Sequence, residues 1–217
     1  MNNKALITYF ERLVTPERLE KIKTFLLLRT RHVSVALEDL YQSHNAAAIV
    51  RSCEAFGVQD IHCITDKNKF QVKNTIASGA AKWLTLQEHK TTDGCIASLK
   101  QRGYTIVATS PNANTTLENI SLDQKIVLLF GTEQDGLSQS AIEQADQLIK
   151  IPMFGFTQSL NVSVSVGICL QLVTARLRNS NINWQLSIAE QDDLYLEWLK
   201  KSVPHADLLE KRLLEIK

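Results

Sequence analysis

The chain has 217 residues, of which 44% are hydrophobic and 22% charged, and its formal net charge is +1 at pH 7. This composition excludes an intrinsically disordered protein, and the length suffices for one ordinary domain with appendages. Because the net charge is close to zero, any attraction for nucleic acid has to come from local basic patches. No apolar run is long enough to span a bilayer and no secretory signal is visible, so we expect a soluble, cytoplasmic protein.

The first residues are expected to form a basic helical extension, 1–31. Leu13, Leu19 and Ile22 contribute to an apolar stripe. Pro16 stands where a helix can begin. Basic side chains outnumber acidic ones over this segment, which predicts a positively charged surface.

Residues 32–179 are expected to form the main domain, in which short β-like runs alternate with helical segments. The predicted strands are 33–37, 61–64, 83–86, 105–108, 126–130 and 148–151. The predicted helices between them are 45–56, 93–101 and 138–145. Such alternation is typical of an α/β protein with a largely parallel sheet flanked by helices.

The segment from Val162 to Leu172 fits two patterns. Its even positions are all apolar, which suits a strand, but several apolar positions also have helical spacing. We predict a helix, because the segment continues to Leu177 without a break. A C-terminal extension, 180–217, is expected to contain a short polar linker and then helices at 187–201 and 204–217.

Two compact polar loops interrupt apolar runs in the second half of the chain. The first, within 126–138, contains two glycines with the spacing of a phosphate-binding loop, and the second lies within 151–163. However, Leu137 stands where the phosphate-binding lysine should be, and Glu133 would repel a phosphate. A ligand with a positive charge, or an amine, therefore fits these loops better.

A third segment, Asn45 to Gly57, predicts a helix with Asn45 as its N-cap and Gly57 just beyond its C-terminus. Arg51 lies on this helix among alanines, which leaves room for a second chain or a substrate phosphate to approach. The alternative is an exposed helical arginine without a function.

Taken together, the three segments resemble the motifs of the SpoU family. They read Asn45-x-x-Ala48-x-x-Arg51, then Phe130-Gly-Thr-Glu-Gln-Asp-Gly-Leu-Ser138, then Ile151-Pro-Met153 with Gln158-Ser-Leu-Asn-Val162. This family comprises RNA 2′-O-ribose methyltransferases of the SPOUT superfamily, which use S-adenosylmethionine. The resemblance covers roughly residues 33–178. The helical extensions resemble those of members that methylate guanosine 18 in the D-loop of tRNA, which implies tRNA as the substrate.

The resemblance implies a homodimer with its active site at the subunit interface and a deep trefoil knot at the C-terminal side of the sheet. It also implies that S-adenosyl-L-methionine lies bent in that knot. The residues that match the family's cofactor contacts are Thr109, Gly131, Ile151, Met153 and Leu160. Core packing is the alternative for the three apolar members of this set, and both roles are compatible because an adenine pocket needs apolar walls.

The catalytic set implied by the resemblance consists of Arg51, Asn45, Glu133, Ser159 and Asn161. Because a guanidinium is effectively never deprotonated, we expect Arg51 to hold a substrate phosphate and stabilise the developing alkoxide. Asn45 is expected to orient Arg51 or the substrate. Glu133 is expected to accept backbone N–H bonds or to anchor the arginine, and a purely structural ion pair is the alternative. Ser159 and Asn161 are expected to shape the cofactor loop and to donate hydrogen bonds near the reacting ribose, with helix capping as the alternative for Asn161.

The residues expected to contact RNA are Arg12, Arg18, Arg29 and Arg176, and ordinary solvated side chains are the alternative. The five histidines are far apart in sequence and share no ligand spacing with cysteines or acids, so no metal site is predicted. The four cysteines lack C-x-x-C spacing and are expected to be buried free thiols.

Three other functions compete with tRNA methylation. Many ribosomal RNA 2′-O-methyltransferases carry an additional folded N-terminal domain, whereas only about thirty residues precede the first strand predicted here. A non-catalytic RNA-binding module of the same fold is disfavoured by the intact catalytic set. A nucleotide-binding oxidoreductase is disfavoured because G-x-G-x-x-G does not follow the first strand.

Overall fold

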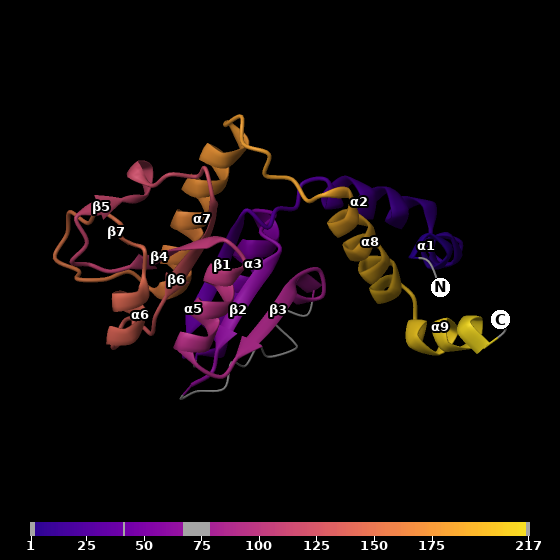
Figure 1. Ribbon diagram of the computed structural model, residues 1–217, viewed down its shortest axis with the longest axis horizontal. Coiled ribbons are helices and arrows are strands. Elements are labelled where there is room, and N and C mark those ends of the chain that lie inside the picture. The colour runs from indigo at the N-terminus through magenta and orange to yellow at the C-terminus, as the bar shows by residue number, and fades with distance from the viewer. Residues whose placement is uncertain (1–2, 41, 67–78, 216–217) are drawn as a thin grey trace. The chain divides into compact units, whose positions relative to one another are not determined.

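The computed structural model describes residues 3–40, 42–66 and 79–215 (Figure 1). The chain divides into two compact units. One consists of Thr30–Trp184, and the other joins Met1–Arg29 with Gln185–Lys217. The larger unit holds the sheet, and the smaller one is helical among its described residues.

The sheet has the strand order β3-β2-β1-β6-β4-β7-β5. Its strands are β1 (Val33–Glu38), β2 (Asp60–Ile64), β3 (Thr85–His89), β4 (Tyr104–Thr109), β5 (Thr115–Thr116), β6 (Lys125–Phe130) and β7 (Gln147–Lys150). Every strand pair among the described residues is parallel, so the predicted parallel sheet is confirmed. The strand predicted at 83–86 starts later, at Thr85, because Trp83 still belongs to a turn in which its N–H donates to the Ala80 carbonyl.

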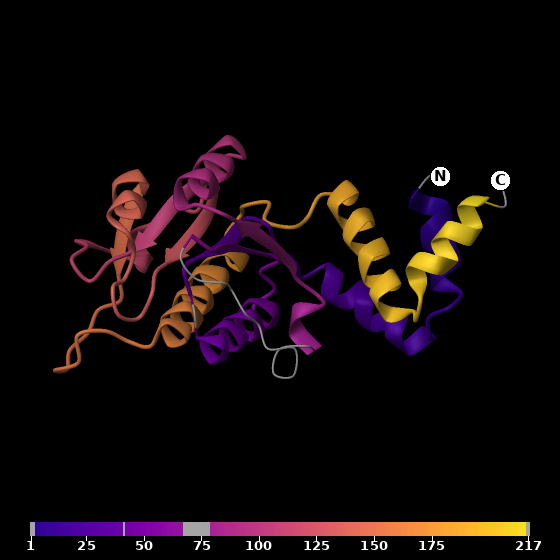
Figure 2. The same ribbon diagram turned by 90° about the horizontal axis from the view of Figure 1, so that it is seen from below.

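Helices cover both faces of the sheet, as Figure 2 shows. α3 (Ser43–Ala55) and α7 (Val162–Arg178) lie on one face, and α5 (Thr92–Gln101) and α6 (Gln139–Gln144) on the other. A 3₁₀ turn, η1 (Leu117–Asn119), follows β5. The alternating side chains of β6 enter the two cores, since Leu128 packs with the α3–α7 side and Val127 and Leu129 pack with the α5–α6 side. A strand buried on both faces explains the continuous apolar run at 126–130.

The N-terminus of α3 differs from the prediction, whereas its C-terminus matches it. The helix begins at Ser43 with Gln42 in the N-cap position, so the prediction that Asn45 caps it is wrong. Gly57 has φ +73° and follows the C-cap, as predicted. Its N–H donates to the Glu54 carbonyl at 3.1 Å, while the Val58 N–H donates to the Cys53 carbonyl at 2.9 Å. This is the Schellman arrangement of a helix C-terminus.

The helical unit contains α1 (Asn3–Glu11), α2 (Pro16–Leu26), α8 (Ile188–Ser202) and α9 (Ala206–Glu215). Pro16 opens α2, and the Thr15 side chain accepts from the Arg18 N–H. Ser187 and Glu190 form a reciprocal capping box at the start of α8. Phe10 and Trp198 are buried between these helices. No helix in the described ranges has both the length and the apolarity needed to cross a membrane.

The four cysteines, Cys53, Cys63, Cys95 and Cys169, are buried free thiols, which confirms their prediction. The helix predicted from 162 onward is also confirmed and extends to Arg178. The trefoil knot stays a prediction.

We expect Gly57→Ala to lower the free energy of unfolding by about 1–2 kcal/mol, because a Cβ strains the left-handed conformation that ends α3. Chemical denaturation measures this loss. Gly155→Ala is the matched control, since its added Cβ meets no atom within 4 Å and its φ lies outside the left-handed range. Equal losses in the two variants would contradict the assigned role of Gly57.

Candidate functional site

A cavity of about 460 Å³ opens at the carboxyl ends of β4, β6 and β7. Its walls come from four segments, within 109–112, 130–137, 149–153 and 158–165, and from Ile142 of α6. Because the strands are parallel, their carboxyl ends meet at one edge of the sheet, which is where open α/β sheets bind ligands. The volume lies in the usual range for small-molecule sites.

The five residues predicted to bind the cofactor all line this cavity. They are Thr109, Gly131, Ile151, Met153 and Leu160. Glu133 and Ser159 of the predicted catalytic set line it as well. The sequence therefore identified the residues of one cavity, although their contacts with a cofactor stay a prediction.

The loop after β6 folds back on its own backbone. The Thr132 N–H donates to the Gly136 carbonyl at 2.9 Å, and the Gly136 N–H donates to the Thr132 carbonyl at 3.1 Å. A Cβ on Gly131 would lie 2.0 Å from the Gly136 oxygen, so no side chain fits there. Gly136 itself has φ +69°. This loop therefore contributes mainly backbone to the cavity wall. Such a wall suits recognition of a ligand by N–H and carbonyl groups.

Three residues of the predicted catalytic set are joined by hydrogen bonds beside the cavity. The side-chain amides of Asn45 and Asn161 both donate to Oε1 of Glu133, the second at 2.8 Å. The Asn161 amide also lies 3.1 Å from Oδ1 of Asn45. The network connects the first turn of α3, the loop after β6 and the start of α7. It therefore brings together all three sequence motifs.

Two roles expected within this network need adjustment. Glu133 accepts from two side-chain amides, and among the described residues of this chain it contacts neither a backbone N–H nor Arg51, so its anchoring of an arginine stays a prediction. Asn161 does cap α7, because its Oδ1 accepts from the Ser163 N–H at 2.9 Å and the Val164 N–H at 3.4 Å. Asn161 thus has two functions, capping with its oxygen and bridging with its amide.

A second acidic residue, Glu38, supports the site and was not found from the sequence. It ends β1, is 4% exposed, and accepts from Thr92 Oγ1 at 2.5 Å. It also accepts from the Ser138 N–H and the Ser138 hydroxyl, each at 2.7 Å. Ser138 ends the loop after β6 and caps α6. The only available signal was one acid at the end of the apolar run 33–38.

Arg51 is exposed on α3 and does not line the cavity. Ala48 and Ala55, one turn to each side of it, are exposed too. Within the described ranges the Arg51 guanidinium makes no hydrogen bond or ion pair, so it is available to a group from outside the chain.

The four arginines expected to bind RNA lie in different environments. Arg12 and Arg18 are exposed in the helical unit. Arg29 is 3% exposed, and its guanidinium lies 5.1 Å from the centre of the Trp198 ring. Arg176 donates to the backbone carbonyls of Leu117 and Ile120, which anchors the η1 turn to α7. Arg29 and Arg176 therefore have structural contacts, and RNA contacts by all four stay predictions.

Comparison with known proteins supports the family that the three motifs indicate. The sequence matches the SpoU rRNA Methylase family over residues 32–171. This match spans the sheet, the cavity and the Asn45–Glu133–Asn161 network, and the chain belongs to this family.

Relatives and solved structures narrow the comparison. The chain is 38% identical to the tRNA (guanosine(18)-2′-O)-methyltransferase of Borreliella burgdorferi over 94% of both chains. It is similar to the structure of the Aquifex aeolicus TrmH/SpoU tRNA modifying enzyme, with a TM-score of 0.78 and 29% identity over 86% of this chain and 97% of that one. The AdoMet-bound rRNA methyltransferase of Sinorhizobium meliloti has a TM-score of 0.62 and 25% identity, over 71% of this chain and 59% of that one.

Removing the Glu38 carboxylate should loosen the loop after β6. We expect Glu38→Ala to lower the free energy of unfolding by about 2–3 kcal/mol, because the buried hydroxyl of Thr92 and the partly buried donors of Ser138 lose their acceptor. Denaturant titration gives this value. Glu88→Ala removes an exposed carboxylate from β3 and should change stability by less than about 0.5 kcal/mol. A Glu38→Ala variant as stable as Glu88→Ala would contradict the role of Glu38 in holding the loop after β6.

Proposed function

We propose that this protein transfers a methyl group from S-adenosylmethionine to the 2′-hydroxyl of guanosine 18 in tRNA. The observation that carries the proposal is the convergence of the three SpoU motifs on one cavity, through the Asn45–Glu133–Asn161 network. The 38% identity to a tRNA (guanosine(18)-2′-O)-methyltransferase over 94% of both chains supports tRNA as the substrate. A tRNA substrate also implies a cytoplasmic location.

The cavity suits S-adenosylmethionine in size and charge. Ile151, Met153 and Leu160 would form apolar walls for its adenine, and the backbone around Gly131 would hold its polar groups. The acids Glu133 and Asp135 outnumber the single lysine of the lining, Lys150, which favours a cationic ligand. When bound, this cofactor supplies an electrophilic methyl group on a sulfonium, so the protein mainly has to align donor and acceptor.

The acceptor needs a group that stabilises its oxygen as the hydroxyl proton leaves to water. We assign this role to Arg51, which would hold a phosphate of the RNA bidentately and stabilise the developing alkoxide. A guanidinium keeps its own protons, so Arg51 does not act as the base. Ser159, at the rim of the cavity, would help to position the ribose.

Arg51 lies outside the cavity of its own chain, which supports a homodimer with shared active sites. α3 presents the small exposed residues Ala48 and Ala55, and α7 presents Val164, 48% exposed, and Ile168, 41% exposed. Pairing of two copies through these helices would bury apolar surface and bring Arg51 of one copy to the cavity of the other.

The helical unit is the proposed tRNA-binding surface. Arg12 and Arg18 are exposed on it, and in a dimer two such units would contact one RNA. Binding through phosphate contacts should weaken steeply as salt is raised. Two alternatives remain, methylation of ribosomal RNA and RNA binding without catalysis. A methylation assay distinguishes both from the proposed function.

Incubation with labelled S-adenosylmethionine tests the reaction directly. We expect label in unmodified tRNA, mapped to the 2′-oxygen of guanosine 18, and none in ribosomal RNA. A tRNA with 2′-deoxyguanosine at that position is the matched control and should take up no label. Label confined to ribosomal RNA would defeat the tRNA assignment. Absence of cofactor binding in calorimetry would defeat methyl transfer altogether.

Arg51 variants test its role. We expect Arg51→Ala to lower kcat by about 10²–10³-fold, because one preorganised donor to the developing charge is lost. Arg51→Lys should retain part of the activity, since it keeps the charge without the bidentate geometry. Activity of Arg51→Lys no higher than that of Arg51→Ala would contradict charge stabilisation.

Mixed dimers test whether Arg51 acts across the interface. Arg51→Ala chains are combined with Gly131→Val chains, in which the added side chain collides with the Gly136 backbone and so disrupts the cavity wall of that chain. If Arg51 serves the partner's cavity, the mixture regains activity that neither variant has alone. If Arg51 serves its own chain, the mixture stays inactive.

A further inference from the structure

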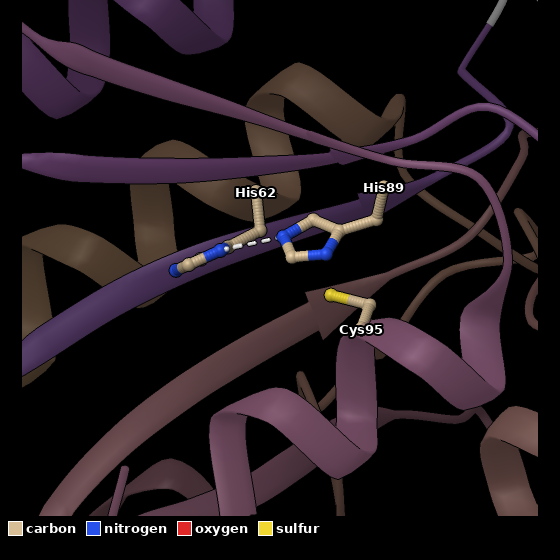
Figure 3. Close-up of side chains that lie close together, drawn as sticks. All are labelled: His62, His89 and Cys95. Carbon is tan, nitrogen blue, oxygen red and sulfur yellow. Dashed lines mark hydrogen bonds between the residues drawn. The ribbon is translucent and has the colours of Figure 1, made fainter.

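A cluster of potential metal ligands lies away from the cavity, between β2, β3 and α5 (Figure 3). His62 lies on β2, His89 ends β3, and Cys95 lies in the first turns of α5. In the parallel register His62 is opposite Gln87, and His89, two residues further on, points to the same face of the sheet. α5 covers that face, so the Cys95 sulfur points from this helix toward the two rings.

The three side chains are already close to one another. Nδ1 of His62 and Nε2 of His89 are 3.1 Å apart. One nitrogen from each ring and the Cys95 Sγ all lie within 4.8 Å of one another. A tetrahedral zinc ion keeps two nitrogen ligands about 3.3 Å apart, and a nitrogen and a sulfur about 3.6 Å apart. These separations are close to what an ion requires. Because the hydrogen-bonded nitrogens point at each other, each ring has to turn by roughly 35° to aim its lone pair at a shared ion, and the sulfur has to approach by roughly 1 Å.

The protonation states suit metal binding. Burial, followed by the charges of His89 and Arg102, lowers the pKa of His62 to about 3. Burial, followed by Arg102, also lowers the pKa of His89. Both shifts favour the neutral form of the ring, and a neutral imidazole offers one nitrogen lone pair to an ion once the hydrogen bond between the rings opens.

We propose that His62, His89 and Cys95 form a binding site for a zinc-type transition metal ion. Two imidazoles and one thiolate match the preferences of Zn²⁺ or Co²⁺, whereas Mg²⁺ and Ca²⁺ prefer oxygen ligands. The Cys95 thiol loses its proton to water when its sulfur binds the ion, and the proton shared by the rings moves to a nitrogen that does not bind. A water molecule would occupy the fourth position, because the cluster among the described residues supplies three ligands.

The charges around the cluster set the affinity. Arg102 is the cation that acts on all three ligands, and its guanidinium lies 3.7 Å from the buried carboxylate of Asp60. Asp60 therefore offsets part of the repulsion between Arg102 and a divalent ion. Burial raises the pKa of Cys95 to about 12, so the metal has to displace a firmly held proton.

A bound ion would fasten the edge of the sheet. β3 is the outermost strand on this side and pairs only with β2 among the described strands. α5 begins at Thr92, whose hydroxyl donates to Glu38. Metal binding would join β2, β3 and α5, which should raise Tm by roughly 5–10 °C at a hundredfold excess of free metal over Kd.

Titration of the full, untagged, chelator-treated chain with Co²⁺ tests the site. We expect one ion per chain, with a sulfur-to-cobalt absorption band in the near ultraviolet and the visible bands of tetrahedral cobalt. Cys95→Ser should abolish the sulfur band and His89→Gln should weaken binding at least tenfold, in line with removal of one ligand. Cys169→Ser is the matched control, because Cys169 is equally buried in α7 but lies outside the cluster.

The wild-type titration decides the proposal even if a variant fails to fold. No stoichiometric Co²⁺ or Zn²⁺ binding by the wild-type chain, or a sulfur band that persists in Cys95→Ser, would overturn it. A sulfur band lost in Cys169→Ser and kept in Cys95→Ser would place the metal elsewhere and overturn it as well. Circular dichroism of each variant confirms that loss of the band is not loss of the fold.

Discussion

The pairing of β6 with β1 on one side and with β4 on the other is the interaction on which both core and site depend. It buries β6 on both faces, so its side chains supply the centre of two apolar cores. It also fixes where the strand ends, and the loop that follows is the main wall of the cavity. A slip of one residue would exchange the two faces and misplace Glu133 at the same time.

Two carboxylates then hold that loop by its two ends. Glu133, near its start, accepts amides from the first turn of α3 and the cap of α7. Glu38 accepts the donors of Ser138, where the loop ends. Neither acid is paired with a cation among the described residues, so directional hydrogen bonds, not charge pairing, set the geometry of the loop.

The sequence predicted what depends on periodicity and local spacing. The parallel sheet, the long helix α7 and the turn at Gly57 follow from apolar patterns and from one residue's backbone freedom. Contacts between side chains that are far apart in the sequence could not be predicted from such patterns. Glu38 and Ser138 are a hundred residues apart in sequence, and Asn45 looked like a helix cap until its amide was seen to reach Glu133. The histidine–cysteine cluster was missed for the same reason, since its spacing only becomes meaningful once β2 and β3 are paired.

The position of β6 in the chain also bears on how the protein emerges from the ribosome. β1 ends at Glu38, but its central partner does not begin until Lys125, and α7, which closes the same core, ends at Arg178. Until then the nascent chain carries an unpaired apolar edge on β1, a form of exposure that promotes wrong pairing. The ribosome must therefore synthesise most of the domain before the motif on α3 can contact the other two motifs. A chain that ends prematurely would be bound by chaperones or degraded by proteases.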